Sequence, residues 1–374
     1  MFRRNNIPVR AALLALAPAL LSAQPPAAGL RNSFQVRLPA GSPVSVVSAD
    51  WGQSSAAARG GAMQVELHST LVLKNSSPRR IRAVSLLVLA QEVTPGGRGS
   101  VTVPSLDIAP GESFPVRIDL RLMRPLAPAA GALVEVGLDG VLFEDLTFFG
   151  PNRLNTRRAM LAWEMEARRD RKALLAALES GGEGGLRNAL LAAVARAGAQ
   201  SRIPVQVARA LPATNVEDER SVQFAFLQVP DSPVELLSGE ARMAQMEVRA
   251  PRIELRNGSR RSIKFVELGW LARDGQGLDY AAGTLPAEIA LAPGQRSTIR
   301  QDGALRFSRP VSALTAYPAV VEFADGGMWV PPSAAWQDAR LAQSLPVSGE
   351  LARLAGLYRL KGLQAVVQQL RSMR

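Results

Sequence analysis

The chain contains two similar stretches about 180 residues apart, and this internal repeat constrains its fold more than any other feature. Residues 73–90 align without a gap to residues 255–272, and Leu, Asn, Ser, Arg, Ile, Val and Ala recur at matching places. Both stretches predict a strand, a polar turn and a second strand, because apolar residues alternate on either side of the turn. A unit that occurs twice in this way indicates duplication and two similar domains.

Further landmarks recur in the same order in both copies. The corner at residues 108–111 returns at 291–294, and the run containing Asp139-Gly140 is matched to the run containing Asp325-Gly326. Asp-Gly between apolar runs predicts a hairpin turn in each copy. Each copy has about 110 residues of short alternating strands, which is the size and rhythm of an immunoglobulin-like β-sandwich.

Helical sequence follows each copy. A helix is predicted from about residue 156 to 179, and the glycines at 181–185 separate it from a second helix ending at Gly198. The chain ends in an amphipathic helix from Gly349, with Ser348 as its cap and Gly362 as a bend.

The predicted fold is therefore mainly β with added helices: two tandem immunoglobulin-like β-sandwiches, a helical hairpin between them and a C-terminal helix. The apolar helix faces are expected either to dock on the sandwiches or to pair two molecules as a homodimer. The predicted segments are a signal peptide (1–23), sandwich 1 (24–152), the helical hairpin (153–200), sandwich 2 with a lead-in strand (201–333) and a C-terminal helical segment (334–374).

The turn at Asn257, the following strand with Phe265 and Trp270, and the Leu-x-Pro-Gly corner after it resemble bacterial extracytoplasmic immunoglobulin-like modules of the FxLYD and CARDB type. The resemblance implies a secreted sandwich used for interaction or spacing, with no catalytic residues to carry over. The first copy departs from the second at the end of the strand, where Gln91-Glu92 replaces Arg273-Asp274. The resemblance covers residues 33–150 and 221–332.

The first residues read as a secretory signal. A basic start with Arg3 and Arg4 precedes an apolar run over residues 11–21, and cleavage is expected after Ala23. The apolar run is shorter than the roughly 20 residues that span a bilayer, and an uncleaved anchor is the alternative. No lipoprotein attachment is expected because the chain has no cysteine. The mature protein is expected in the periplasm or outside the cell, without a membrane span.

Composition limits the chemistry and suggests the partners. The absence of cysteine excludes thiol catalysis and iron–sulfur ligation. The net charge of +12 favours anionic partners such as wall polymer, lipopolysaccharide or nucleic acid. The competing explanation is that arginine usage follows genome composition and the charge only keeps the protein soluble.

Four arginines in the two repeated turns are the candidate binding residues. Their planar guanidinium groups suit bidentate capture of phosphate or carboxylate, and two clusters in tandem would bind a polyanion with avidity. The alternative is that they are solubilising charges on exposed turns. The run 168–172 is expected to be a solvated helix face. The candidate anion-binding residues are Arg79, Arg80, Arg260 and Arg261.

No catalytic site is predicted. His68 is the only histidine and is expected to be a solvated strand residue, so a zinc site of the usual His/Cys kind is excluded by count. Glu135 and Glu322 are expected on outer strand faces, and Asp139 and Asp325 in turns, which does not favour a carboxylate pair for hydrolysis.

Two asparagines, Asn75 and Asn257, fit the acceptor pattern for N-glycosylation. The tight turn offers a simpler reason for them, since Asn and Gly tolerate left-handed backbone.

The expectation is an exported, non-enzymatic interaction or structural module of the cell envelope, with no cofactor and no metal. Its partner is an unknown protein or an anionic envelope polymer. The alternatives are a polyanion binder that uses the paired arginine turns, and a carboxylate-based hydrolase.

Overall fold

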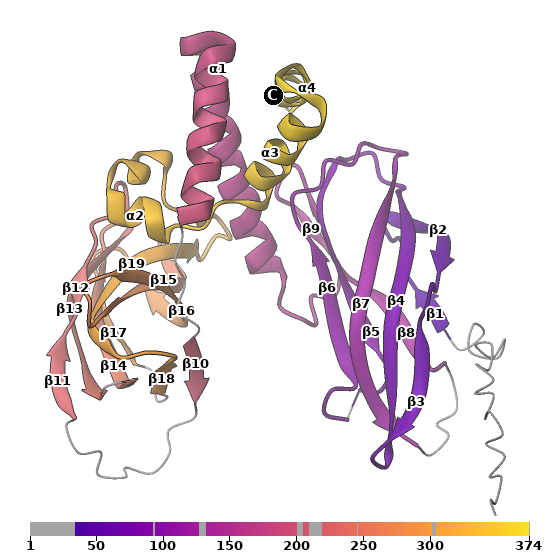
Figure 1. Cartoon of the computed structure of the whole chain (residues 1–374), viewed down its shortest axis with the longest axis horizontal. Coiled ribbons are helices and arrows are strands. Elements are labelled where there is room, and N and C mark those ends of the chain that lie inside the picture. The colour runs from indigo at the N-terminus through magenta and orange to yellow at the C-terminus, as the bar shows by residue number, and fades with distance from the viewer. Residues whose placement is uncertain are drawn as a thin grey trace, which may run out of the picture.

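The fold is mainly β, with two sandwiches side by side and helices between and above them in a computed structural model (Figure 1). The structure describes residues 34–92, 94–126, 132–199, 205–208, 219–244, 246–300 and 304–373. The predicted signal peptide lies outside these residues. Among the described helices, none is long and apolar enough to cross a membrane.

Sandwich 1 consists of two sheets that enclose one apolar core. One sheet has the order β1 (Phe34–Arg37), β8 (Val134–Phe143), β5 (Ile81–Leu89) and β6 (Arg98–Val103), with β9 (Phe148–Phe149) also pairing β8. The other is built on β4 (Ala62–Asn75), which pairs β2 (Val44–Asp50), β3 (Ser55–Arg59) and β7 (Ser113–Pro125). Alternate residues of β4 and β7 are buried, as the sequence pattern predicts for strands with one face on a core.

Sandwich 2 repeats this plan. One sheet has the order β12 (Ala225–Phe226), β19 (Val311–Phe323), β15 (Ile263–Asp274) and β16 (Asp279–Leu291), with β20 (Met328–Trp329) pairing β19. The other has the order β10 (Val205–Ala208), β18 (Ala304–Phe307), β14 (Glu247–Asn257), β13 (Val234–Ala244) and β11 (Arg220–Gln223), with β17 (Arg296–Arg300) also pairing β14. In both sandwiches the first sheet opens with a short strand parallel to its neighbour.

The repeated turns carry the same hydrogen bonds. Asn75 donates from Nδ2 to the carbonyls of Arg79 (2.8 Å) and Ile108 (3.1 Å). Asn257 donates to Arg261 (2.8 Å) and Leu291 (3.0 Å) in the same way. Both asparagines are fully buried.

The explanation of these asparagines by left-handed backbone is wrong. Neither Asn75 nor Asn257 has a positive φ, and neither does Gly258. Each asparagine joins the turn to the distant corner through its side chain, because the buried amide donates to a carbonyl in each of them.

The predicted hairpin at Asp139-Gly140 is also wrong. Both residues lie inside β8, and the turn is at residues 144–147. Asp139 is buried and accepts a hydrogen bond from the backbone N–H of Arg153 (2.6 Å). Gly140 is required because the Phe148 ring lies 2.3 Å from the position of a Cβ atom. Asp325-Gly326 is a turn between β19 and β20, so it does not correspond to Asp139-Gly140 in the structure.

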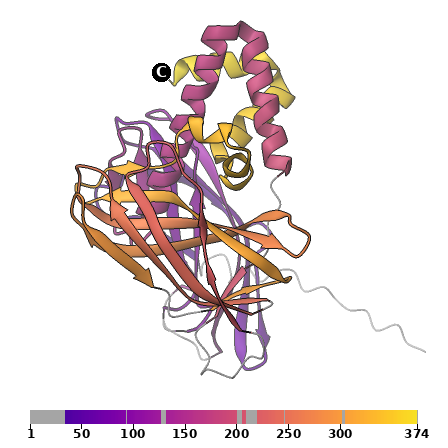
Figure 2. The same ribbon diagram turned by 90° about the vertical axis from the view of Figure 1, so that its left-hand side faces the viewer.

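The helices form the predicted hairpin, and the predicted single C-terminal helix is divided in two at Gly362. Helix α1 (Arg157–Ala199) is broken at Gly182, whose φ of 59° is left-handed, and its two arms run side by side (Figure 2). Beyond β20 come η2 (Ser333–Gln337) and α2 (Ala339–Ser344). Helices α3 (Gly349–Lys361) and α4 (Leu363–Ser372) then meet at Gly362, and Ser348 caps α3 by accepting from Leu351 N at 3.1 Å.

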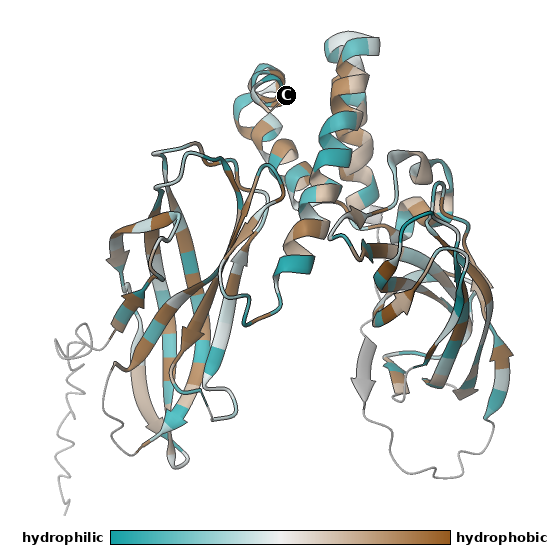
Figure 3. Cartoon of the chain, turned by 180° about the vertical axis from the view of Figure 1, so that it is seen from behind, coloured by the Kyte–Doolittle hydropathy of each residue, from teal (hydrophilic) through white to brown (hydrophobic). Residues whose placement is uncertain are grey.

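The apolar faces of the helices pack in two ways. The start of α1 docks on both sandwiches, with Met160 on sandwich 1 and Ala162 on sandwich 2. Farther along, the two arms of α1 pack on α3 and α4 in a separate helical core. Apolar and polar residues alternate around these helices (Figure 3). The members of the helical core are Leu174, Leu186, Leu190, Ala193, Leu351, Leu354, Leu363, Val366, Val367 and Leu370.

Candidate functional site: a charged junction around helix α1

Two of the predicted arginines occupy equivalent places and brace their own turns. The guanidinium of Arg79 stacks on Phe143 at 3.7 Å and pairs with Asp145 at 3.4 Å. That of Arg261 stacks on Phe323 at 3.8 Å and pairs with Asp325 at 2.5 Å. Hydrogen bonds from Arg261 hold the pKa of Asp325 below its usual range.

The other two arginines differ from each other. Arg80 donates to Asp107 at 2.9 Å and lies 3.9 Å from Glu144, whereas Arg260 is exposed. The structure therefore does not gather the four arginines into one surface. Three of them are already paired with carboxylates of the same sandwich.

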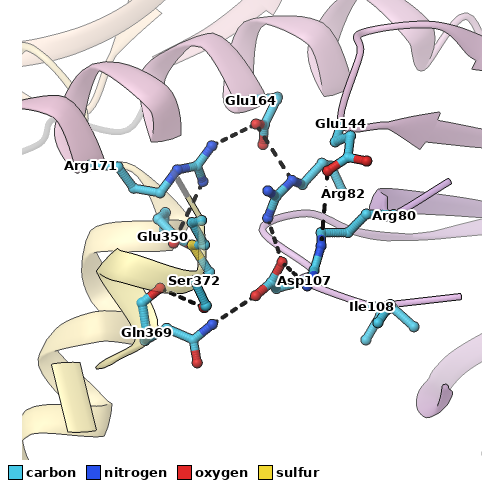
Figure 4. Close-up of polar contacts among 12 residues, drawn as sticks. Arg80, Arg82, Asp107, Ile108, Glu144, Glu164, Arg171, Glu350, Gln369 and Ser372 are labelled. Carbon is cyan, nitrogen blue, oxygen red and sulfur yellow. Dashed lines mark hydrogen bonds and ion pairs between the residues drawn. The ribbon is translucent and has the colours of Figure 1, made fainter. Parts of the chain in front are cut away.

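A denser polar network lies where sandwich 1 meets the helices (Figure 4). Asp107 accepts from Arg80 and, at 2.7 Å, from Arg82 of β5. Its second oxygen accepts from Gln369 of α4 at 2.7 Å. One carboxylate, whose side chain is 10% exposed, thus joins the sheet to the C-terminal helix.

Glu164 of α1 is the second centre of this network. Its side chain is 3% exposed, and its Oε1 accepts from Arg168 at 3.1 Å and Arg171 at 2.7 Å. Arg82 approaches the same oxygen at 3.9 Å. Arg171 also lies 3.5 Å from Glu350 of α3, so the network connects sandwich 1, α1 and α3.

The expectation that residues 168–172 form a solvated helix face is wrong for most of the run. Asp170 and Arg171 are buried, while Lys172 is exposed. Arg169 donates to the carbonyl of Pro331 at 3.1 Å, on the side of sandwich 2. The residues are buried because α1 is covered on several sides, which the local sequence does not reveal.

A cleft of about 530 Å³ opens beside Glu164. Its polar wall carries the side chains of Arg82, Arg168, Arg171 and Lys172. Burial lowers the pKa of the Arg82 guanidinium, and Arg171 lowers it further, although Glu164 and Asp107 act in the opposite direction. The cleft combines chain segments that lie far apart in sequence.

On the other side of α1, a buried carboxylate fixes the helix to sandwich 2. Glu322 of β19 is 2% exposed and accepts from Arg158 at 2.6 Å, with Lys264 at 2.9 Å and Arg157 at 3.4 Å. Burial disfavours its charged form, but the hydrogen bonds from Arg158 and Lys264 outweigh burial, and the pKa of Glu322 is lowered. Arg158 also stacks on Phe265 at 3.7 Å.

Comparisons with known proteins do not assign this chain to a family. No family model matches this sequence, and no curated protein matches it significantly. A red sea bream transglutaminase matches over 75% of this chain and 29% of its own, with 11% identity and a TM-score of 0.13. A β-glucosidase from Kluyveromyces marxianus matches over 68% and 44%, with 9% identity and a TM-score of 0.14. A structure named pT26-6p matches over 87% and 72%, with 7% identity and a TM-score of 0.17. The chain spans less than half the length of the first two, and scores this low carry no argument about function.

The carboxylates considered for hydrolysis are not brought together. Glu135 lies in sandwich 1 and pairs with Arg37 at 3.3 Å, whereas Glu322 lies in sandwich 2 under α1. Glu322 is on the outer face of its strand, as expected, but the helix covers that face. Asp139 is occupied by backbone N–H groups and Asp325 by Arg261.

One carboxyl at the junction has a strongly altered pKa. Glu166 of α1 is 8% exposed, and burial raises its pKa to about 7. The charge of Arg169 opposes this shift, while Asp170 and Glu267 add smaller increases. The charged groups that act on it are Arg169, Asp170 and Glu267, so we interpret Glu166 as a buried interface carboxyl.

His68 is exposed, as predicted, and its Nδ1 lies 3.1 Å from Asp119. Within the described part of the chain, no three His, Cys, Asp or Glu side chains are grouped to hold a metal ion. The chemistry that the junction offers is therefore charge pairing: it holds three parts of the molecule together and leaves a basic cleft between them.

Proposed function

We propose that this protein is a non-enzymatic interaction or structural module of the bacterial cell envelope, exported after cleavage near Ala23. In this proposal it acts as a spacer that presents two immunoglobulin-like sandwiches in one fixed relative orientation. The resemblance to FxLYD- and CARDB-type modules belongs to the same proposal.

The observation that carries the proposal is the double attachment of α1. The network at Glu164 and Asp107 joins α1, α3 and α4 to sandwich 1. The network at Glu322 joins α1 to sandwich 2. A flexible linker between sandwiches would need neither, because relative motion is the default for domains joined by small polar contacts.

Fixed orientation can be measured by a distance between two spin labels. The chain has no cysteine, so Arg117→Cys in β7 and Thr298→Cys in β17 give two unique attachment points on exposed strand faces. Pulsed electron–electron double resonance should give one narrow distribution of distances between the two labels, and Glu322→Ala should broaden this distribution. Glu288→Gln, which changes an exposed partner of the same Arg158, should leave it narrow. A broad distribution in the unmutated background would refute the spacer.

Export is tested separately by fractionation. The proposal requires that the protein is found in the periplasmic or extracellular fraction. Its measured mass should be that of a chain beginning at Gln24. Retention of the full-length chain in the cytoplasm would contradict it.

Two alternatives are less well supported. Binding of a polyanion by the arginine turns would have to compete with Asp107, Asp145 and Asp325 for the same guanidinium groups. A homodimer through the helices would need apolar faces that α1, α3 and α4 cover within one chain. We therefore propose a monomer as the working unit.

A further inference from the structure

The cleft beside Glu164 has more positive than negative charge in its wall. Arg82, Arg168, Arg171 and Lys172 line it, against the two carboxylates Glu144 and Glu179. The cations come from β5 and from one stretch of α1, so the fold itself concentrates them. A volume of about 530 Å³ is within the range of small-molecule sites.

Hydrogen-bond donors exceed acceptors at the base of the cleft. A single oxygen of Glu164 serves Arg168 and Arg171, and the Nε of Arg82 is buried without a hydrogen-bond partner. Each guanidinium has five N–H groups. The contacts to Glu164, Glu350, Asp107 and the carbonyl of Glu144 engage only part of them. Lys172 is exposed at the rim. The cleft therefore presents donors that suit a planar or tetrahedral oxyanion.

The lining of the cleft also includes apolar side chains. Leu175 and Ala176 follow the cations by one turn of α1, and Met373 lies at the end of α4. A methionine in such a position adapts to ligands of different shape. A cleft lined by both cations and apolar side chains suits an amphipathic ligand.

We propose that this cleft binds a small organic anion, with a phosphate or carboxylate head held by Arg168, Arg171 and Lys172 and a short apolar tail along Leu175 and Met373. Such a ligand would lie between α1 and the end of α4, beside Arg82 and Glu144 of sandwich 1. The proposal does not depend on the spacer function, since it concerns a site and not the orientation of the sandwiches.

The test is isothermal titration calorimetry at low salt with hexyl phosphate, hexanoate, inorganic phosphate and hexylamine. We expect saturable binding of a hexyl anion, about tenfold or more tighter than inorganic phosphate because the tail is buried. Hexyl phosphate binding more tightly than hexanoate would assign a phosphate head, and the reverse order a carboxylate. Hexylamine binding as tightly as the anions would overturn the proposal.

Variants locate the site. Arg168→Gln together with Lys172→Ala should weaken binding of the preferred anion by at least about tenfold, since two charged contacts are lost. Met373→Ser should reduce the advantage of the hexyl chain over inorganic phosphate while leaving phosphate affinity unchanged. The matched control is Arg187→Gln, an exposed arginine on the second arm of α1. Because Lys172 is exposed, Lys172→Ala alone should fold and still weaken binding. Equal loss in the Arg187 control, or no saturable binding of either hexyl anion, would overturn the proposal.

Discussion

Arg158 donates a hydrogen bond from Nε to Oε2 of Glu322 at 2.6 Å, although 164 residues separate them in the sequence. The contact joins the first turn of α1 to a central strand of sandwich 2. Around it, Lys264 and Arg157 share the same carboxylate. One buried acid is thus the main polar attachment of the helix to this sandwich.

Replacing Glu322 should therefore be costly. Glu322→Ala leaves three cations around a vacated carboxylate site, and we expect a loss of about 3 kcal/mol in unfolding free energy. Denaturant unfolding measures it. Glu288→Gln is the control, because Glu288 binds the same Arg158 but is 71% exposed, and we expect less than about 1 kcal/mol there. Equal losses in both variants would mean that burial of Glu322 does not matter.

The buried asparagines should be intolerant of the smallest possible change. Asn75→Asp removes an amide that serves two carbonyls and places a carboxylate against them, so we expect a loss of about 3 kcal/mol or more. Asn257→Asp should cost a similar amount, because its hydrogen bonds are the same. Lys74→Ala, beside Asn75 but exposed, should change stability by no more than about 0.5 kcal/mol. Thermal melts that do not separate these variants would show that the amide is dispensable.

A glycine pair tests the corrected register of β8. Gly140→Ala puts a methyl group into the Phe148 ring and should destabilise the protein by about 1–3 kcal/mol. Gly184→Ala lies in α1 with nothing within 4 Å of the new atom, and should stabilise by about 0.5–1 kcal/mol. A crystal structure of Gly140→Ala should show a displaced Phe148 ring. A Phe148 ring that keeps its position would contradict the placement of Gly140 inside β8.

Glu166 gives the protein a pH dependence of defined sign. Its folded pKa of about 7 lies above the value of an exposed glutamate, so the folded state holds a proton that the unfolded state loses first. Stability from this group is complete below about pH 4.5 and is lost as pH rises to about 7, by at most about 3 kcal/mol. Glu166→Gln should remove that loss, so the difference between variant and parent should grow from pH 5 to pH 8. A constant difference would show that Glu166 is ionised in the folded protein.

The strands and turns were predictable because their signals are local. Alternation in β4 and β7, the Ser348 cap and the break near Gly182 can each be recognised within a short window. Asp139-Gly140 was wrongly predicted as a turn because Asp-Gly is common in turns. Here Asp139 instead accepts a hydrogen bond from the loop at Arg153, and Gly140 leaves space for the ring of Phe148. The first copy uses both residues inside a strand.

The site was not predictable for a different reason. Glu322 was placed correctly on the outer face of its strand, but only the tertiary structure shows that α1 covers that face. Arg82, Lys172 and Met373 belong to three separate segments that meet only when the helices close on sandwich 1. The arginine pairs are adjacent in sequence, yet two of the four arginines, Arg79 and Arg261, brace their own turns.

The shared apolar core of α1, α3 and α4 also sets an order of assembly. Each sandwich has its own core and can close as soon as its strands are made, because domains fold as units during synthesis. The apolar side of α1 cannot be covered at that stage, because its partners α3 and α4 are synthesised after all of sandwich 2. Until α3 and α4 have been made, the two folded sandwiches are joined by an α1 whose apolar side is still uncovered. Packing of α3 and α4 on α1 then fixes the sandwiches relative to each other.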